Sequence, residues 1–127
     1  MNLLHKELSS DVIRIFYEVY NELGYGFLEK VYQNAMYIEL LKSGYNIEAQ
    51  KKINVIYKSQ IVGEYYADII VENKIIIELK ANQGLSEENE SQLINYLKSS
   101  KIEIGLLLNF GFKPEFKRLI FTNNIKL

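Results

Sequence analysis

The sequence predicts a single α/β domain in which a mixed β-sheet is flanked by helices. Two stretches with apolar residues at helical spacing come first, and three stretches with a period of two follow them. A strand, helix, strand order near the C-terminus then implies a parallel, right-handed crossover. The 127 residues contain no linker or repeat and are enough to bury one continuous core, so we expect one domain over residues 1–127.

The first part of the chain is expected to form two helices. Ser9, Ser10 and Asp11 are suitable N-caps for a helix that ends near Leu23. A glycine-rich break at residues 24–26 separates it from a second helix, which opens at Phe27 or Leu28 and stops before Gly44. The two helices together form an αα unit.

Three strands in an antiparallel meander are expected next. Residues 47–57 alternate with a period of two, and residues 61–81 read as two Ile- and Val-rich strands joined by the polar turn 72–74. After a loop, Ser86 can cap a helix that runs to about Ser99.

The C-terminal part is expected to add two strands. Residues 102–110 form a continuous apolar run, which is typical of a strand that is buried on both faces. Residues 115–121 form the last short strand.

Three charged residues, Asp68, Glu78 and Lys80, lie inside the apolar hairpin and require an explanation. A charge in a buried strand is unfavourable unless a partner or a metal compensates it. If residues 72–74 form a three-residue loop, Asp68 lies directly opposite Glu78, and Glu78 and Lys80 share one face. A two-residue loop would move Asp68 to the opposite face.

Two explanations fit these three residues from their spacing alone. Carboxylates on adjacent strands suit a hard cation such as Mg²⁺, and a lysine beside them could orient a water molecule and stabilise charge on a phosphate. A salt bridge from Lys80 to Glu78 or Asp68 accounts for the same residues equally well.

Composition and charge narrow the function classes. The chain has no cysteine, which excludes disulfides, thiol catalysis and thiolate zinc sites and fits a reducing cytoplasm. No apolar run approaches the roughly 18 residues of a membrane span, and the N-terminus lacks the long apolar segment of a secretory signal. The formal net charge of −1 argues against tight, nonspecific DNA binding, although a local positive groove is enough for an enzyme that acts on nucleic acid.

Three motifs in order resemble those of a known family. Asp68 followed by Glu78-Leu79-Lys80 resembles the D…ExK motif of the PD-(D/E)XK nuclease superfamily. Residues 26–32, GFLEKVY, fit the G-x-x-E-x-x-Y pattern of the GxxExxY protein family. Residues 92–96, QLINY, resemble the Q-x-x-x-Y motif that follows ExK in the exonuclease-like branch of the PD-(D/E)XK superfamily. The resemblance covers roughly residues 11–121 and implies a restriction-endonuclease-like core.

The resemblance also implies roles for the charged residues. In such nucleases Asp68 and Glu78 would bind Mg²⁺ or Mn²⁺, the carbonyl of Leu79 would complete the shell, and Lys80 would assist the attacking water. Glu29 matches the helix carboxylate that reaches the same site, directly or through water. The alternative for Glu29 is a solvent-facing charge paired with its helix neighbours.

Two residues of the crossover helix also match catalytic positions of the family. Gln92 and Tyr96, at i and i+4, share one helix face. The resemblance implies that Gln92 orients the metal or the phosphate and that Tyr96 hydrogen-bonds nearby. The alternative, which has equal weight, is that Tyr96 packs in the core and its hydroxyl lies at the rim of that core.

The sequence therefore predicts a divalent-metal-dependent nuclease that hydrolyses DNA, with RNA as the alternative substrate. We expect the protein to lie in the cytoplasm and to make no contact with a membrane. A small nuclease that cuts both strands of a duplex would do so as a homodimer, for which the sequence gives no direct sign. The alternative is a module that keeps the nuclease fold, is inactive or weakly active, and binds nucleic acid or a protein partner.

Overall fold

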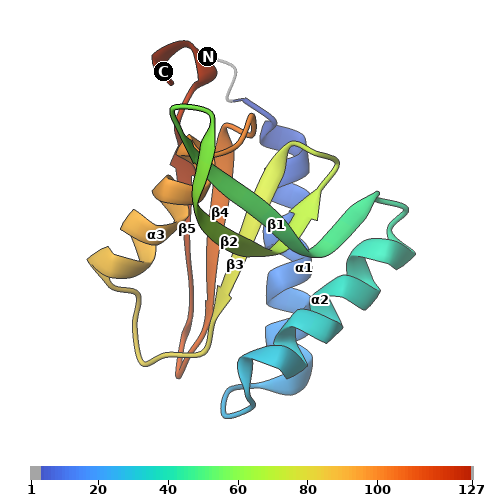
Figure 1. The fold of residues 1–127 in the computed structure, drawn as a ribbon. Coiled ribbons are helices and arrows are strands. Elements are labelled where there is room, and N and C mark those ends of the chain that lie inside the picture. Colours follow the sequence, from blue (N-terminus) through green and yellow to red (C-terminus); the bar gives the residue numbers. More distant parts are fainter. Residues whose placement is uncertain (1–3, 127) are drawn as a thin grey trace.

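Five strands form one mixed sheet in the order β1-β2-β3-β4-β5 (Figure 1). The structure, a computed structural model, describes residues 4–126. Its elements, in chain order, are α1 (Lys6–Leu23), α2 (Glu29–Lys42), β1 (Ile47–Tyr57), β2 (Gln60–Val71), β3 (Ile75–Lys80), α3 (Glu87–Lys98), β4 (Ile104–Phe110), β5 (Pro114–Ile120) and the 3₁₀ turn η1 (Asn123–Ile125).

The sheet separates two apolar cores. Helices α1 and α2 cover one face and α3 covers the other (Figure 1). Residues alternate between the faces, so that Ile75, Ile77 and Leu79 of β3 pack toward α1 and α2, whereas Ile76 packs toward α3. Because Glu78 and Ile76 are two residues apart, the Glu78 carboxylate emerges on the α3 side.

The predicted fold class and strand order are confirmed. Strands β1, β2 and β3 form the antiparallel meander, and β3 pairs with β4 in parallel through the α3 crossover. Every residue of β4 is buried, as expected for a strand covered on both faces. The α3 helix begins with a reciprocal capping box between Ser86 and Asn89.

The turn between β2 and β3 is the predicted three-residue loop. Val71 pairs with Ile75, and Lys74 N donates to Val71 O at 2.9 Å. Glu72 and Asn73 adopt the left-handed conformation, each with φ of 53°. The pairs Ile70↔Ile76 and Ile69↔Ile77 continue this register and place Asp68 and Glu78 at the next position.

The predicted N-caps of the first helix are wrong. Residues 9–11 lie inside α1, which begins about one turn earlier. The Ser9 side chain is buried, and its hydroxyl accepts a hydrogen bond from Arg118 Nε at 3.4 Å. The Asp11 carboxylate accepts from the hydroxyl of Tyr45. Both polar side chains are therefore used in tertiary contacts and not in capping, which a local sequence pattern does not reveal.

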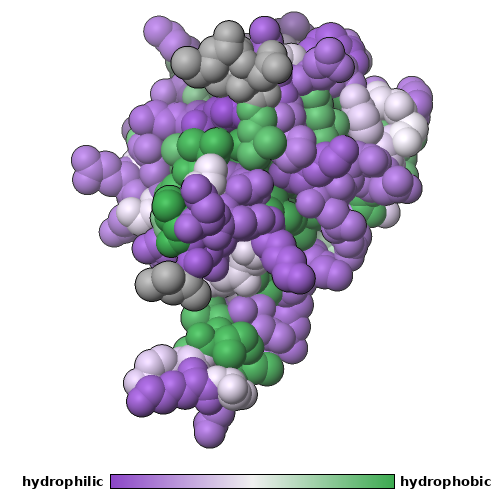
Figure 2. All heavy atoms as spheres, turned by 90° about the horizontal axis from the view of Figure 1, so that it is seen from above, coloured by the Kyte–Doolittle hydropathy of each residue, from purple (hydrophilic) through white to green (hydrophobic). Residues whose placement is uncertain are grey.

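The β1–β2 hairpin extends beyond the rest of the sheet as a two-stranded arm. In Figure 2 its tip forms a lobe that projects from the rim of the molecule and carries apolar residues. Exposed apolar side chains at this tip are those of Ile56, Tyr57, Ile61 and Val62. Within residues 4–126, no helix has both the length and the apolar character needed to cross a membrane.

Candidate functional site

The candidate site forms where β2 separates from β3. The backbone pairing between the two strands ends at Ile69 and Ile77. Beyond these residues, two carboxylates accept hydrogen bonds from the backbone N–H groups of the opposite strand. Asp68 N donates to Glu78 Oε1 at 3.1 Å, and Leu79 N donates to Asp68 Oδ2 at 2.8 Å. Each carboxylate is thus held by the opposite strand, and the two acidic side chains lie side by side.

Two glutamines hold the other side of Asp68. Gln50 lies opposite Asp68 in the β1–β2 register, yet the pairing is interrupted there because Gln50 has a φ of 52°. Gln33 of α2 is buried, and its Nε2 donates to Asp68 O at 3.1 Å. Gln50 Nε2 lies 3.1 Å from Gln33 Oε1 and 3.5 Å from Asp68 Oδ1.

Sequence reasoning missed both glutamines. Gln33 follows Glu29 by four residues and therefore shares its helix face, which is a signal that could have identified it. Gln50 gave no signal, because its role depends on a left-handed backbone conformation within a strand.

Lys80 points toward the crossover helix. Its Nζ lies 3.5 Å from Gln92 Oε1. Among the described residues, Lys80 forms no ion pair with Asp68 or Glu78, so the alternative of a salt bridge is not observed. The structure therefore brings Asp68, Glu78, Lys80 and Gln92 to one region between β3 and α3.

Tyr96 belongs to the core beneath this region. Its side chain is 5% exposed, and its ring centroid lies 4.8 Å from that of Tyr65. Burial, followed by the negative charges of Glu78 and Asp68, raises the pKa of Tyr96 to about 12. The hydroxyl is therefore neutral at physiological pH and can act as a hydrogen-bond donor.

The surroundings of Glu78 favour the protonated form of its carboxyl group. Burial is the largest cause that raises the pKa of Glu78 to about 8, and the charge of Asp68 raises it further. The N–H of Asp68 and the charge of Lys80 act in the opposite direction. The metal-free Glu78 carboxyl group is therefore mostly protonated at neutral pH.

The pair has the donor chemistry of a site for a hard divalent cation. Asp68 Oδ1 and Glu78 Oε2 accept no backbone hydrogen bond from any residue between 4 and 126, so they are the oxygens available to a ligand. A cation would take the place of the Glu78 proton and relieve the repulsion between the two groups. The residues present therefore fit Mg²⁺ or Mn²⁺.

Glu29 does not join the two carboxylates in one compact cluster. Over the described part of the chain, no three His, Cys, Asp or Glu side chains are grouped closely enough to hold a metal ion. Glu29 is the exposed first residue of α2, one turn before Gln33, whose side chain does reach Asp68. Its helix face thus points toward the site.

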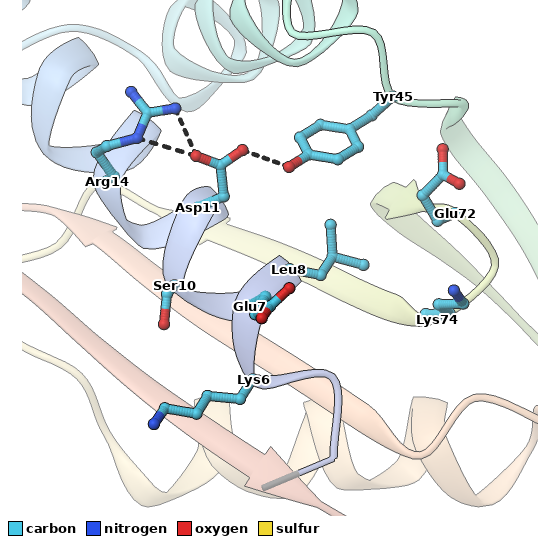
Figure 3. A pocket seen from close by; sticks show the side chains of 9 residues that line it. All are labelled: Lys6, Glu7, Leu8, Ser10, Asp11, Arg14, Tyr45, Glu72 and Lys74. Atoms are coloured by element: carbon cyan, nitrogen blue, oxygen red, sulfur yellow. Dashed lines mark hydrogen bonds and ion pairs between the residues drawn. The ribbon is translucent and has the colours of Figure 1, made fainter. Parts of the chain in front are cut away.

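A cavity of about 670 Å³ lies elsewhere, between α1 and the β2–β3 turn (Figure 3). Here Asp11 is bound by Arg14 and by Tyr45. These hydrogen bonds lower the pKa of Asp11 and raise the pKa of Tyr45 to about 12. Asp11, Arg14 and Tyr45 are thus paired with one another and join α1 to the segment before β1. Its lining residues are Lys6, Glu7, Leu8, Ser10, Asp11, Arg14, Tyr45, Glu72 and Lys74.

Comparison with known proteins identifies related sequences and folds. The family model of the PD-(D/E)XK nuclease superfamily matches residues 6–119. None of the curated proteins matches this chain. The crystal structure of SSO0001 has the same fold, with a TM-score of 0.56 at 20% identity, over 73% of this chain and 50% of that chain. This chain therefore spans about half the length of that relative.

Proposed function

This chain belongs to the PD-(D/E)XK nuclease superfamily, and we propose that it is a divalent-metal-dependent nuclease that hydrolyses phosphodiester bonds of DNA. The observation that carries the proposal is the pairing of Asp68 with Glu78 at the point where β2 leaves β3, with Lys80 on the same side. The G-x-x-E-x-x-Y pattern of residues 26–32 supports the narrower assignment to the GxxExxY family.

Each site residue has a distinct proposed role. Asp68 and Glu78 would hold Mg²⁺ or Mn²⁺, with the carbonyl of Leu79 and the carboxylate of Glu29 as further ligands. When bound, the metal would supply Lewis-acid activation of water and neutralisation of phosphate charge.

The remaining residues would position the reactants. Lys80 would orient the attacking water in line with the scissile bond and stabilise the charge that develops on the phosphoryl oxygens. Gln92 would hold the Lys80 ammonium group, to which its Oε1 is the nearest acceptor at 3.5 Å. Tyr96, with its neutral hydroxyl, would support Gln92 from below.

Cleavage assays test the proposal directly. Linear, circular and single-stranded DNA would be incubated with Mg²⁺ or Mn²⁺ and with the wild type, Glu78→Ala or Lys80→Ala. We expect cleavage by the wild type and a loss of about 100-fold or more in each variant, because each removes a group that acts on the reacting phosphate. Lys101→Ala, which removes an exposed lysine far along the chain from the motif, is the matched control and is expected to cut normally.

Two outcomes would refute the enzyme assignment: a wild type that cuts none of the substrates, or Glu78→Ala and Lys80→Ala variants that cut as well as Lys101→Ala. The second candidate function is a noncatalytic module that binds nucleic acid or protein. The absence of a third clustered carboxylate within residues 4–126 favours that candidate. It predicts DNA or protein binding without cleavage.

A further inference from the structure

Three loops meet at the end of the sheet where β3 ends. They are the α1–α2 loop, the start of the β3–α3 loop directly after Lys80, and the β4–β5 turn, all at the lower end of Figure 1. Together they line a cavity of about 310 Å³. The residues that line it are Tyr25, Gly26, Phe27, Ala81, Asn82, Gln83, Phe110, Gly111 and Phe112.

The cavity is bordered by three exposed aromatic rings, which we call the aromatic platform: Tyr25, Phe27 and Phe112. They are 58%, 46% and 67% exposed, respectively. The ring centroids of Tyr25 and Phe112 lie 5.0 Å apart with an interplanar angle of 55°. A cluster of exposed rings around a hollow is more typical of a binding surface than of a solvated loop.

The half-buried Tyr20 and the buried Tyr32 fix the backbone beneath the platform. The hydroxyl of Tyr20 lies 2.8 and 2.7 Å from the carbonyl oxygens of residues 111 and 112. The hydroxyl of Tyr32 donates to Gly24 O at 2.6 Å and accepts from Phe27 N at 3.2 Å. The rings are therefore presented from loops that are already ordered, which lowers the entropic cost of binding.

The loop after Lys80 is fixed to the same unit. Asn109 is fully buried, and its side-chain amide bonds both the N–H and the carbonyl of Asn82, each at 3.0 Å. At Gly111 a Cβ atom would lie 2.2 Å from Asn82 O, so only glycine allows the two loops to approach this closely. The platform and the end of β3 thus form one rigid surface.

We propose that the aromatic platform stacks unpaired bases, so that the substrate at this site is a strand with a single-stranded segment. This inference rests on the proposed function for its position beside the scissile phosphate. Aromatic rings bind exposed bases with little sequence preference, because every base has a π-face. The bases of an intact duplex are already stacked and cannot be reached in this way.

The charge distribution agrees with this occupant. Lys113 directly follows Phe112, and Lys30 lies in the first turn of α2, so both exposed lysines flank the platform and can contact phosphates. Of the acidic residues close to these lysines, Glu29 is the one that we assign to the metal, and Glu115 lies two residues after Lys113. The formal net charge of the chain is −1, so stacking would supply affinity that charge does not.

Strand geometry places the platform beside the end of β3. Lys80 points toward α3, whereas the next residue, Ala81, packs against the core on the α1 and α2 side and lines the cavity. The cavity of the platform therefore begins directly after Lys80. We place the stacked base on the same strand as the scissile phosphate.

Binding measured without cleavage tests the proposal. A labelled oligothymidylate of about 12 nucleotides and a blunt duplex of equal length would be titrated in EDTA by fluorescence anisotropy. Tyr25→Leu and Phe112→Leu keep apolar bulk but remove the π-face, and each is expected to raise the Kd for the single strand about tenfold. Tyr25→Trp and Phe112→Tyr are expected to retain binding. Tyr57→Leu, at a ring that is 59% exposed on the β1–β2 hairpin, is the matched control.

The proposal fails if the wild type does not bind the single strand or if the leucine variants bind it as well as Tyr57→Leu does. It also fails if the leucine substitutions weaken duplex binding as much as they weaken single-strand binding. Ultraviolet crosslinking of a 5-iodouracil oligonucleotide to the wild type is expected to label Tyr25 or Phe112, and labelling only elsewhere would overturn it. A platform-dependent binder that cuts no DNA would refute the proposed function alone. Cleavage that persists with unchanged binding in the leucine variants would refute this inference alone.

Discussion

The ionisation of Glu78 is strongly affected by its surroundings. Its side chain is 4% exposed and lies beside a second carboxylate, that of Asp68. A buried carboxylate next to a like charge is unfavourable, and the nearby Asp68 N–H and Lys80 compensate it only in part. The Glu78 carboxyl group is therefore favoured in its protonated form, and the proposed cation would bind in competition with that proton.

The raised pKa of Glu78 makes the stability of the metal-free protein depend on pH. The unfolded chain loses the proton near the ordinary value of 4.5, whereas the folded protein keeps it until about pH 8. Between these values the folded state binds more protons, so the free energy of unfolding falls as pH rises and then levels off. Glu78→Gln should remove this fall and be more stable than the wild type by roughly 3 kcal/mol at pH 9, with little difference near pH 4.

Urea denaturation in EDTA at a series of pH values measures this effect. Glu64→Gln is a suitable control, since Glu64 is a half-exposed carboxylate paired with Lys52. Parallel pH profiles for the wild type and Glu78→Gln would show that the Glu78 carboxyl ionises normally and would contradict its raised pKa.

At the scale of elements, the site depends on where the strands stop pairing. Strand β2 leaves β3 at Asp68, and the β1–β2 ladder is interrupted at the same level by Gln50. The freed backbone groups are taken up by side chains from both neighbouring strands and from α2. A local loss of sheet hydrogen bonds thus creates the space in which carboxylates can face a ligand.

The close approach of the β4–β5 turn to the β3–α3 loop is the second structural requirement. Gly111→Ala would place a Cβ atom 2.2 Å from Asn82 O, so the two loops would have to move apart. We expect this variant to lower the free energy of unfolding by about 1 to 3 kcal/mol in chemical denaturation. Gly63→Ala is the control, because its Cβ would be 3.6 Å from Val55 in ordinary contact, and we expect no loss. Equal stability of the two variants would contradict the tight contact.

Sequence patterns predicted the elements well because their causes are local. The three-residue loop at 72–74, the cap at Ser86 and the apolar run of β4 all follow from neighbouring residues. The start of α1 at Lys6 does not follow from neighbouring residues, because the side chains of Ser9 and Asp11 form hydrogen bonds with residues far along the chain.

The candidate site was predictable only where a motif marks it. Asp68, Glu78, Lys80 and Gln92 come from the motifs, and the register brings the first two together. The structural role of Gln50 and the assembly of the aromatic platform depend on segments distant in sequence, and no periodicity or spacing encodes such contacts.

At the scale of the whole molecule, both proposed binding features lie near the C-terminal end of β3. Lys80 of the proposed metal site is the last residue of β3, and Ala81 lines the cavity of the aromatic platform, so one strand of nucleic acid could contact both. The parallel β3–β4 pair, buried by helices on both faces, provides the rigid base for this arrangement.

The central claim is that Asp68 and Glu78 together bind a divalent cation. A crystal soaked in Mn²⁺ and measured for anomalous scattering tests it most directly. We predict an anomalous peak in contact with carboxylate oxygens of both residues, and no such peak in crystals of Glu78→Gln. A wild-type crystal without a peak between these two side chains would contradict the assignment of this site as a metal-dependent nuclease centre.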